Sequence, residues 1–143
     1  MSINAKNADS VGLFGGIAGA KHSHVIIENL KLQNLNVRGN QYVGGVAGEA
    51  EYTDFINIEI LDNCHISGAS VVGGLIGSAS GVSLIGINFQ DKTSTHVEAT
   101  EFKGLFCGAI RNSLVQDIHD FCSDDQSSLN CTGYDFEVTW EYR

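Results

Sequence analysis

Carboxylates are the side chains whose spacing comes closest to catalytic chemistry in this sequence. Glu59 and Asp62 recur one repeat later as Asn88 and Asp91. In stacked strands, Asp62 and Asp91 would lie about 5 Å apart, a separation that suits a retaining glycosidase and equally suits two solvated side chains. The chain contains no phosphate-binding loop, nucleophile elbow or dinucleotide fingerprint. We therefore expect no catalytic residues, and a polysaccharide-acting enzyme is the alternative.

Histidine and cysteine spacing predicts no metal site and no cofactor. His22 and His24 could point the same way from a strand, but the sequence places no acidic or cysteine partner beside them, so we interpret them as a solvated loop. None of the four cysteines forms a C-x-x-C pair. Cys64 is expected to be a buried thiol, whereas Cys122 and Cys131 either form a disulfide or stay free.

Net charge and hydropathy limit the partners. With 8 Lys and Arg against 17 Asp and Glu the formal net charge is −9, so nucleic acid is a poor partner. No apolar stretch approaches the roughly 20 residues of a membrane helix, so we expect no membrane span. The apolar segment 11–20 resembles a signal peptide, but its four glycines and the preceding Asp9 argue against one.

A Gly-rich repeat must position any functional side chain. Four segments align, at 14–19, 43–48, 72–77 and, more weakly, 103–108. Gly16, Gly45 and Gly74 are evenly spaced by a period of about 29 residues, which is within the range of solenoid repeats, and Gly104 follows one position late. The repeat glycines are Gly15, Gly16, Gly19, Gly44, Gly45, Gly48, Gly73, Gly74, Gly77, Gly104 and Gly108. We expect them to permit either a positive φ at a corner or a close approach of two backbones.

Alternating apolar residues predict strands in every repeat. Ile56, Ile58 and Ile60 show the two-residue period of a half-buried strand, and no segment has a convincing helical period. Two or three short strands per unit are too small to fold alone and need the next unit as cover. The prediction is an all-β fold, a short parallel β-helix (β-solenoid) of about four coils with a C-terminal capping strand.

Finer details of the coils follow from the same alignment. Asn34 and Asn63 would form either an amide ladder or two solvated loop positions. Leu30 and Leu32 sit one residue out of alignment with the next unit, which we attribute to a bulge. His65 should face outward, because it falls between two inward positions.

The C-terminal third does not repeat. We treat 1–143 as a single domain, with repeat coils at 11–110 and a cap at 111–143. The last strand of this cap carries an aromatic face, which would cover the final coil, form a dimer interface or stack on sugar rings. That face consists of Tyr134, Phe136, Trp140 and Tyr142, with Val138 among them. Residues 113–118 fit a strand better than a short helix.

The two central repeats carry a family resemblance. The segments YVGGVAGEAE (42–51) and VVGGLIGSASG (71–81) resemble the GLUG motif of bacterial surface proteins and of the non-catalytic region of IgA-specific metallopeptidases. The resemblance implies a β-helical repeat on an extracellular, adhesin-like protein, with structural residues only. We therefore expect a non-catalytic structural or interaction module that presents its faces to a protein or a carbohydrate, and we expect a homodimer.

Overall fold

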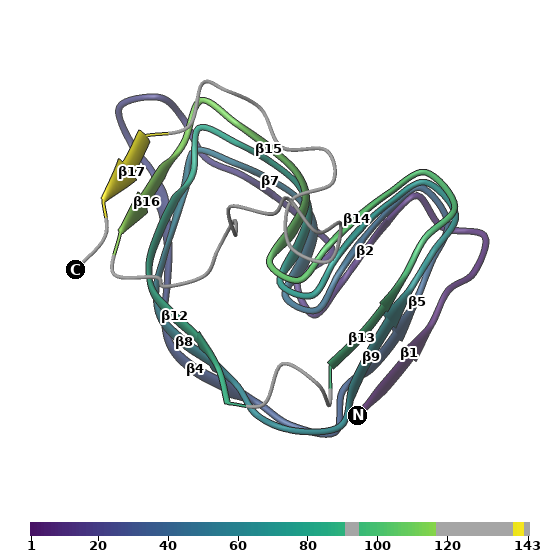
Figure 1. Cartoon of the computed structure of the whole chain (residues 1–143). Coiled ribbons are helices and arrows are strands. Elements are labelled where there is room, and N and C mark those ends of the chain that lie inside the picture. Colours follow the sequence, from purple (N-terminus) through teal and green to yellow (C-terminus); the bar gives the residue numbers. More distant parts are fainter. Residues whose placement is uncertain (91–94, 117–138, 142–143) are drawn as a thin grey trace.

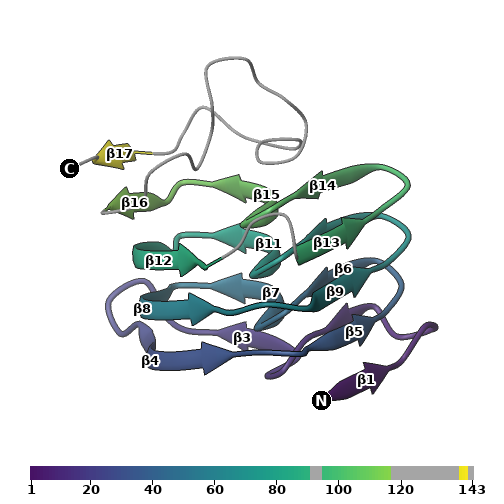
Figure 2. The same ribbon diagram turned by 60° about the horizontal axis from the view of Figure 1, so that its bottom comes forward.

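The chain winds into a short β-solenoid. The computed structural model describes residues 1–90 and 95–116 and the backbone of 139–141. These residues form four sheets of parallel strands and contain no helix. Seen along the axis, the coils superpose; seen from the side, they rise one above another from the N-terminal coil (Figures 1 and 2). The predicted parallel β-helix of about four coils is confirmed.

Each coil gives one strand to each of four sheets, which makes four strands per coil rather than the two or three expected. Sheet 1 contains β1 (Ser2–Asn4), β5 (Asn36–Arg38), β9 (Cys64–Ser67) and β13 (Thr95–Glu98). Sheet 2 contains β2 (Ser10–Val11), β6 (Tyr42–Gly44), β10 (Val71–Gly73) and β14 (Phe102–Gly104). Sheet 3 contains β3 (Gly16–Ala18), β7 (Ala47–Glu51), β11 (Ile76–Ser80) and β15 (Cys107–Arg111). Sheet 4 contains β4 (Val25–Leu32), β8 (Thr53–Ile60), β12 (Ser83–Phe89), β16 (Leu114–Gln116) and β17 (Thr139–Glu141).

The register corrects the alignment of the outer repeats. In sheet 2, Val43 pairs with Val72 one repeat period away, as expected, but it also pairs with Val11. Gly16 consequently lies opposite Glu49 and not opposite Gly45. In the fourth coil Gly104 pairs with Gly73 and not with Gly74. Coils can differ in length because extra residues enter at corners, where no ladder fixes the count. The first coil has such an insertion at 19–24, closed by a bridge between residues 20 and 23.

The paired glycines of the central coils allow backbones to approach closely. A Cβ on Gly44 would lie 2.1 Å from the Ala47 carbonyl oxygen, and a Cβ on Gly73 would lie 2.0 Å from the Ile76 carbonyl oxygen. Neither glycine has a positive φ, so of the two expected roles the close approach of backbones applies to them. In the first coil this position belongs to Gly12, where a Cβ would meet Ala47 Cα at 2.7 Å. Residue types larger than glycine do not fit at these corners.

A column of left-handed residues bends sheet 4. Asn29, Asn57 and Gly86 occupy equivalent positions of β4, β8 and β12, with φ values of 57°, 55° and 65°. Asparagine and glycine are the residues that tolerate this conformation best. The bend interrupts the expected alternation, because Phe55 and Ile58 are fully buried whereas Ile56 is partly exposed. The strict two-residue period proposed for Ile56 is therefore wrong.

The one-residue offset of the first coil lies at a corner and not in a bulge. Leu30 pairs with Ile58 and Leu32 with Ile60 in the sheet 4 ladder. The extra residue of the second coil enters afterwards, on the way to sheet 1, where Asn34 and Asn63 adopt φ values of 54° and 57°. The same two coils are joined by a hydrogen bond between side-chain amides at another position, where Asn57 Nδ2 donates to Asn29 Oδ1 at 2.7 Å.

The core fills two connected spaces. Sheets 1 and 2 pack face to face through aliphatic side chains, and a larger space lies between sheets 3, 4 and 1 (Figure 1). Phe106 and Phe89 meet edge to face in the core with ring centroids 4.8 Å apart. Thr53 and Ser113 are buried, and each hydroxyl donates to a backbone carbonyl two residues away, so neither remains unpaired. The side chains that are less than 2% exposed include Phe55, Ile58, Ile60, Ile66, Leu75, Ile76, Leu84, Val37 and Val43.

The C-terminal region adds to sheet 4. Leu114–Gln116 forms β16, which confirms the expected strand for those residues. The backbone of β17 pairs in parallel with β16 and places Trp140 opposite Val115. Residues Tyr134, Phe136 and Tyr142, together with Cys122 and Cys131, lie outside the described part of the chain.

Candidate functional site

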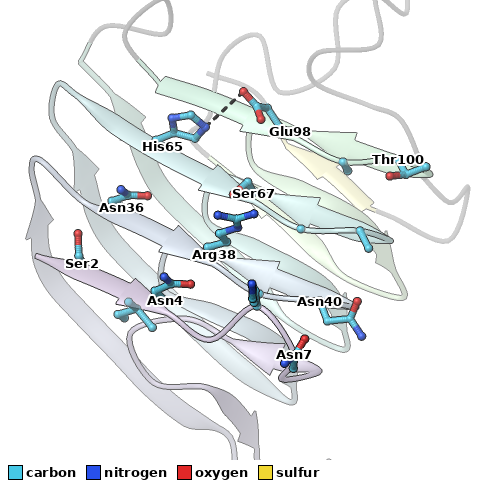
Figure 3. A pocket seen from close by; sticks show the side chains of 16 residues that line it. Ser2, Asn4, Asn7, Asn36, Arg38, Asn40, His65, Ser67, Glu98 and Thr100 are labelled. Carbon is cyan, nitrogen blue, oxygen red and sulfur yellow. Dashed lines mark ion pairs between the residues drawn. The ribbon is translucent and has the colours of Figure 1, made fainter.

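A polar groove runs along the outer face of sheet 1. It has a volume of about 1020 Å³ and spans the strands of all four coils. Its floor is formed by outward side chains of β1, β5, β9 and β13, and they stand clear of the sheet in Figure 3. We call this surface the sheet 1 groove. We take it as the candidate functional site, and it is larger than the hollow beside Tyr52 and the hollow at residues 4–8.

Parallel register arranges the floor of the groove in two rows. One row consists of Ser2, Asn36 and His65, with His96 next in register but outside the lining, and the other of Asn4, Arg38, Ser67 and Glu98. Neighbours in each row are about 4.8 Å apart, the spacing of hydrogen-bonded strands. The rows alternate with Val37, Ile66 and Val97, which turn into the core, and with Ile3, which is partly buried against the core and also borders the groove. The groove therefore presents a grid of amide, hydroxyl, imidazole and charged groups.

Two backbone features shape the wall of the groove. At Gly39 and Gly68 the chain leaves sheet 1 so close to the core that a Cβ would meet valine side chains at 2.7 Å and 2.6 Å, respectively. In the first coil the loop at 5–8 swings out farther than the corresponding turns of the later coils (Figure 1). This loop is anchored where Asn40 donates its backbone N–H to the Ala8 carbonyl oxygen and its side-chain amide to Asp9 Oδ1. Lys6 and Asn7 line the groove from this loop.

Charges in the groove are unevenly partnered. Among the described residues that line it, Lys6 and Arg38 are the cations and Glu98 is the one carboxylate. Glu98 Oε1 lies 3.3 Å from His65 Nε2, and the ring of His65 lies 6.0 Å from that of His96. Among the described residues, no carboxylate lies within ion-pair distance of Lys6 or Arg38. Within the described part of the chain, the positive charge of Lys6 and Arg38 is thus not neutralised by an ion pair.

The carboxylates singled out in the sequence have structural partners. Glu59 aligns with Asn88 as expected, and it lies 3.4 Å from the Lys31 ammonium on the outer face of sheet 4. Asp62 Oδ1 accepts a hydrogen bond of 2.6 Å from the Gln33 amide of the neighbouring coil. Asp91 lies outside the described residues, so the pair with Asp62 stays a prediction.

The histidines take different places from one another. His65 is exposed as predicted, with its ring in the groove. His24 is the last residue of the insertion at 19–24, and its Nδ1 lies 2.8 Å from Asp54 Oδ1 while its ring lies against Tyr52. His24 is exposed, in agreement with a solvated loop, but it also has a carboxylate neighbour, Asp54, that the sequence could not place beside it. Residues 1–90 and 95–116 contain no group of three His, Cys, Asp or Glu side chains that could hold a metal ion.

The described cysteines are core residues. Cys64 is 1% exposed, which confirms the expected buried thiol, and Cys107 is 3% exposed. Burial raises the pKa of the Cys107 thiol far above its usual range, because the thiolate would lose its hydration. Neither thiol is available as a nucleophile in the folded chain.

Sequence reasoning missed the groove, although the sequence holds a signal for it. Asn36 and Arg38 flank the buried Val37, and His65 and Ser67 flank the buried Ile66 one repeat later. Polar residues on both sides of an inward apolar residue mark an outer face, but they do not say which of four outer faces is concave.

Comparisons with protein-family models, curated protein sequences and solved structures give no match. The resemblance to the GLUG motif consequently stays a prediction. None of the described segments is a helix long and apolar enough to cross a membrane.

Proposed function

We propose that this protein is a non-catalytic binding module whose sheet 1 groove holds an extended carbohydrate chain. The observation that carries the proposal is the double row of polar side chains along the solenoid axis. Amide and hydroxyl groups both donate and accept hydrogen bonds, which suits a ligand covered with hydroxyl groups. A hexose unit in an extended polysaccharide is close in length to one strand spacing, so successive sugars could meet equivalent side chains.

A carbohydrate fits the groove better than a protein partner does. Stable protein interfaces usually have buried aromatic, Arg or Met anchors at their centre. The apolar part of the described lining is limited to Ile3, Ala69 and Ala99, and the arginine of the groove, Arg38, is exposed and not buried as an anchor would be. Polar partners can be held by direct and water-mediated hydrogen bonds without such anchors.

The expected cell-surface location and dimeric state belong to the same proposal. An adhesin-like protein on a cell surface would use the solenoid as a rigid support for the groove, and the resemblance to the GLUG motif motivates this assignment. A dimer would be favoured at the first coil, where Leu13, Ile17 and Ile27 are only partly buried because the described residues provide no further coil beneath them.

Blocking the groove tests the proposal. Asn36 and Asn88 are both exposed and lie on the outer faces of sheet 1 and sheet 4. Asn36→Trp should abolish retention on a panel of immobilised polysaccharides, and the matched control Asn88→Trp should leave retention unchanged. Equal behaviour of the two variants, or no retention of the wild-type protein on any polysaccharide, would refute the assignment of the groove.

A further inference from the structure

The sheet 1 groove is positive on a strongly acidic protein. Its described lining includes two of the chain's 8 Lys and Arg residues and one of the 17 Asp and Glu residues. With neutral histidines these described lining residues carry a formal charge of +1, although the whole chain carries −9. Charge of one sign gathered in a groove attracts ligands of the opposite sign. The ligand should therefore bring a negative charge to this surface.

Arg38 is the group best placed to receive that charge. It lies on the second of the four strands, and its neighbours in the row are the neutral Asn4 and Ser67 (Figure 3). Glu98 is two strands away from Arg38, about 10 Å by the strand spacing, where solvent and salt weaken the attraction between exposed charges. Glu98 is also the neighbour of His65. The guanidinium is thus open to a ligand.

The chemistry of Arg38 favours a carboxylate. A guanidinium presents its N–H groups as a planar fork that matches the two oxygens of a carboxylate. Lys6 adds a second charge from the wall of the groove. Two cations are too few for a nucleic acid, whose dense phosphates would be repelled by the other charges of a protein at −9. Sparse carboxylates on a sugar chain fit this pattern.

We propose that the sheet 1 groove binds an acidic polysaccharide built from uronic acids. Arg38 pairs with one uronate carboxylate, Lys6 attracts a second, and Asn4, Asn36 and Ser67 contact the sugar hydroxyls. This assignment rests on the proposed carbohydrate-binding function and adds the class of sugar.

Binding of charged and uncharged forms of one polymer tests the assignment. The probes are polygalacturonate and alginate, each beside its carboxyl-reduced form, which keeps the sugar chain and lacks the charge. We expect the full chain to bind at least one acidic polymer in affinity electrophoresis and calorimetry. The affinity for the carboxyl-reduced form of that polymer should be lower by about tenfold or more. Binding should also weaken as salt is raised.

Matched arginine variants separate this role from a general effect of charge. Arg38→Gln should weaken binding of the acidic polymer about tenfold or more, because a charge-assisted pair is lost. Arg38→Lys should bind with intermediate affinity, because it keeps the charge and loses the fork. Arg111→Gln makes the same change at an exposed arginine of sheet 3 outside the groove, and should bind like the wild-type protein.

The outcomes distinguish the two proposals. If the reduced and acidic polymers bind equally, or if Arg38→Gln binds like Arg111→Gln while Asn36→Trp abolishes binding, the acidic ligand is overturned and the carbohydrate groove stands. If neither the acidic nor the reduced polymers bind, the uronate assignment is overturned. If the protein is also not retained on any polysaccharide of the wider panel, the carbohydrate-binding function is overturned as well.

Discussion

Replacing Gly73 by alanine should destabilise the solenoid far more than replacing Gly16, although both glycines belong to a Gly-Gly pair in the sequence. A Cβ at Gly73 would lie 2.0 Å from the Ile76 carbonyl oxygen, 2.8 Å from Cys107 Cα and 2.8 Å from Gly108 N. All three obstacles are backbone atoms, and two of them belong to the next coil. A Cβ at Gly16 would meet nothing within 4 Å. Neither residue has a positive φ, so the comparison isolates the steric effect.

The expected loss of unfolding free energy depends on which atoms must move to make room for the new Cβ. Overpacking a well-packed core usually costs about 1–3 kcal/mol, and side chains relieve part of that cost by rotating. Backbone cannot rotate away, so relief at Gly73 requires separation of two coils and weakening of ladder hydrogen bonds worth about 0.5–1.5 kcal/mol each. We expect a loss of about 3 kcal/mol or more for Gly73→Ala. Gly16→Ala should be neutral or stabilising by about 0.4–1 kcal/mol, because alanine restricts the unfolded chain.

Urea unfolding followed by circular dichroism measures both free energies. A domain of this kind has a total stability of about 5–15 kcal/mol, so the loss at Gly73 is large enough to shift the midpoint clearly. Gly44→Ala should repeat the effect, since its Cβ would meet the Ala47 carbonyl oxygen at 2.1 Å. The reasoning is refuted if Gly73→Ala loses less than about 1 kcal/mol, or if Gly16→Ala loses as much.

Three further predictions concern the bend, the core and the assembly. Asn57→Ala should be less stable to urea than Asn57→Gly by about 1 kcal/mol, because both variants lose the bond to Asn29 and only alanine strains the positive φ; equal midpoints would contradict this. Because burial raises the pKa of the Cys107 thiol, the folded chain keeps a proton that the unfolded chain releases, so stability should fall as pH rises above about 8.5. Relative to Cys107→Ala, the loss from pH 8.5 to 10.5 should be on the order of 2–3 kcal/mol, and parallel pH profiles for the two proteins would exclude it. Light scattering at high concentration should give a dimer, and a mass of 15.3 kDa would rule the dimer out.

The fold was predictable because its main signal is repetition. Gly44, Gly45, Gly73 and Gly74 recur at a fixed spacing, and absence of proline agrees with continuous ladders. The outer coils were harder to align. Val11 and Gly12 begin the true first copy, but the pair Gly15 and Gly16 imitates the motif a few residues later. Alignment of the sequence matches residue types, whereas the register of the strands is set by backbone hydrogen bonds.

The groove was less predictable than the fold. His65 was correctly placed on the outside, but its neighbour Glu98 comes from the next coil, so a whole turn of the solenoid separates the two along the chain. The sequence did not predict Arg38 as a binding residue, because a single arginine among polar residues forms no recognisable motif. His24 shows the same difficulty, since its partner Asp54 also belongs to the following coil.

By itself, the sequence determined the class of fold, the parallel stacking and the inward position of residues such as Cys64 and Ile66. These properties depend on local patterns of residue type and on their recurrence, both of which can be read from one chain. Tertiary structure alone decided the four-sided coil, the bend at Asn57 and the concave polar face around Arg38. Those features arise when turns of different length bring separate coils into register, and the register is set by backbone hydrogen bonds that residue types do not specify.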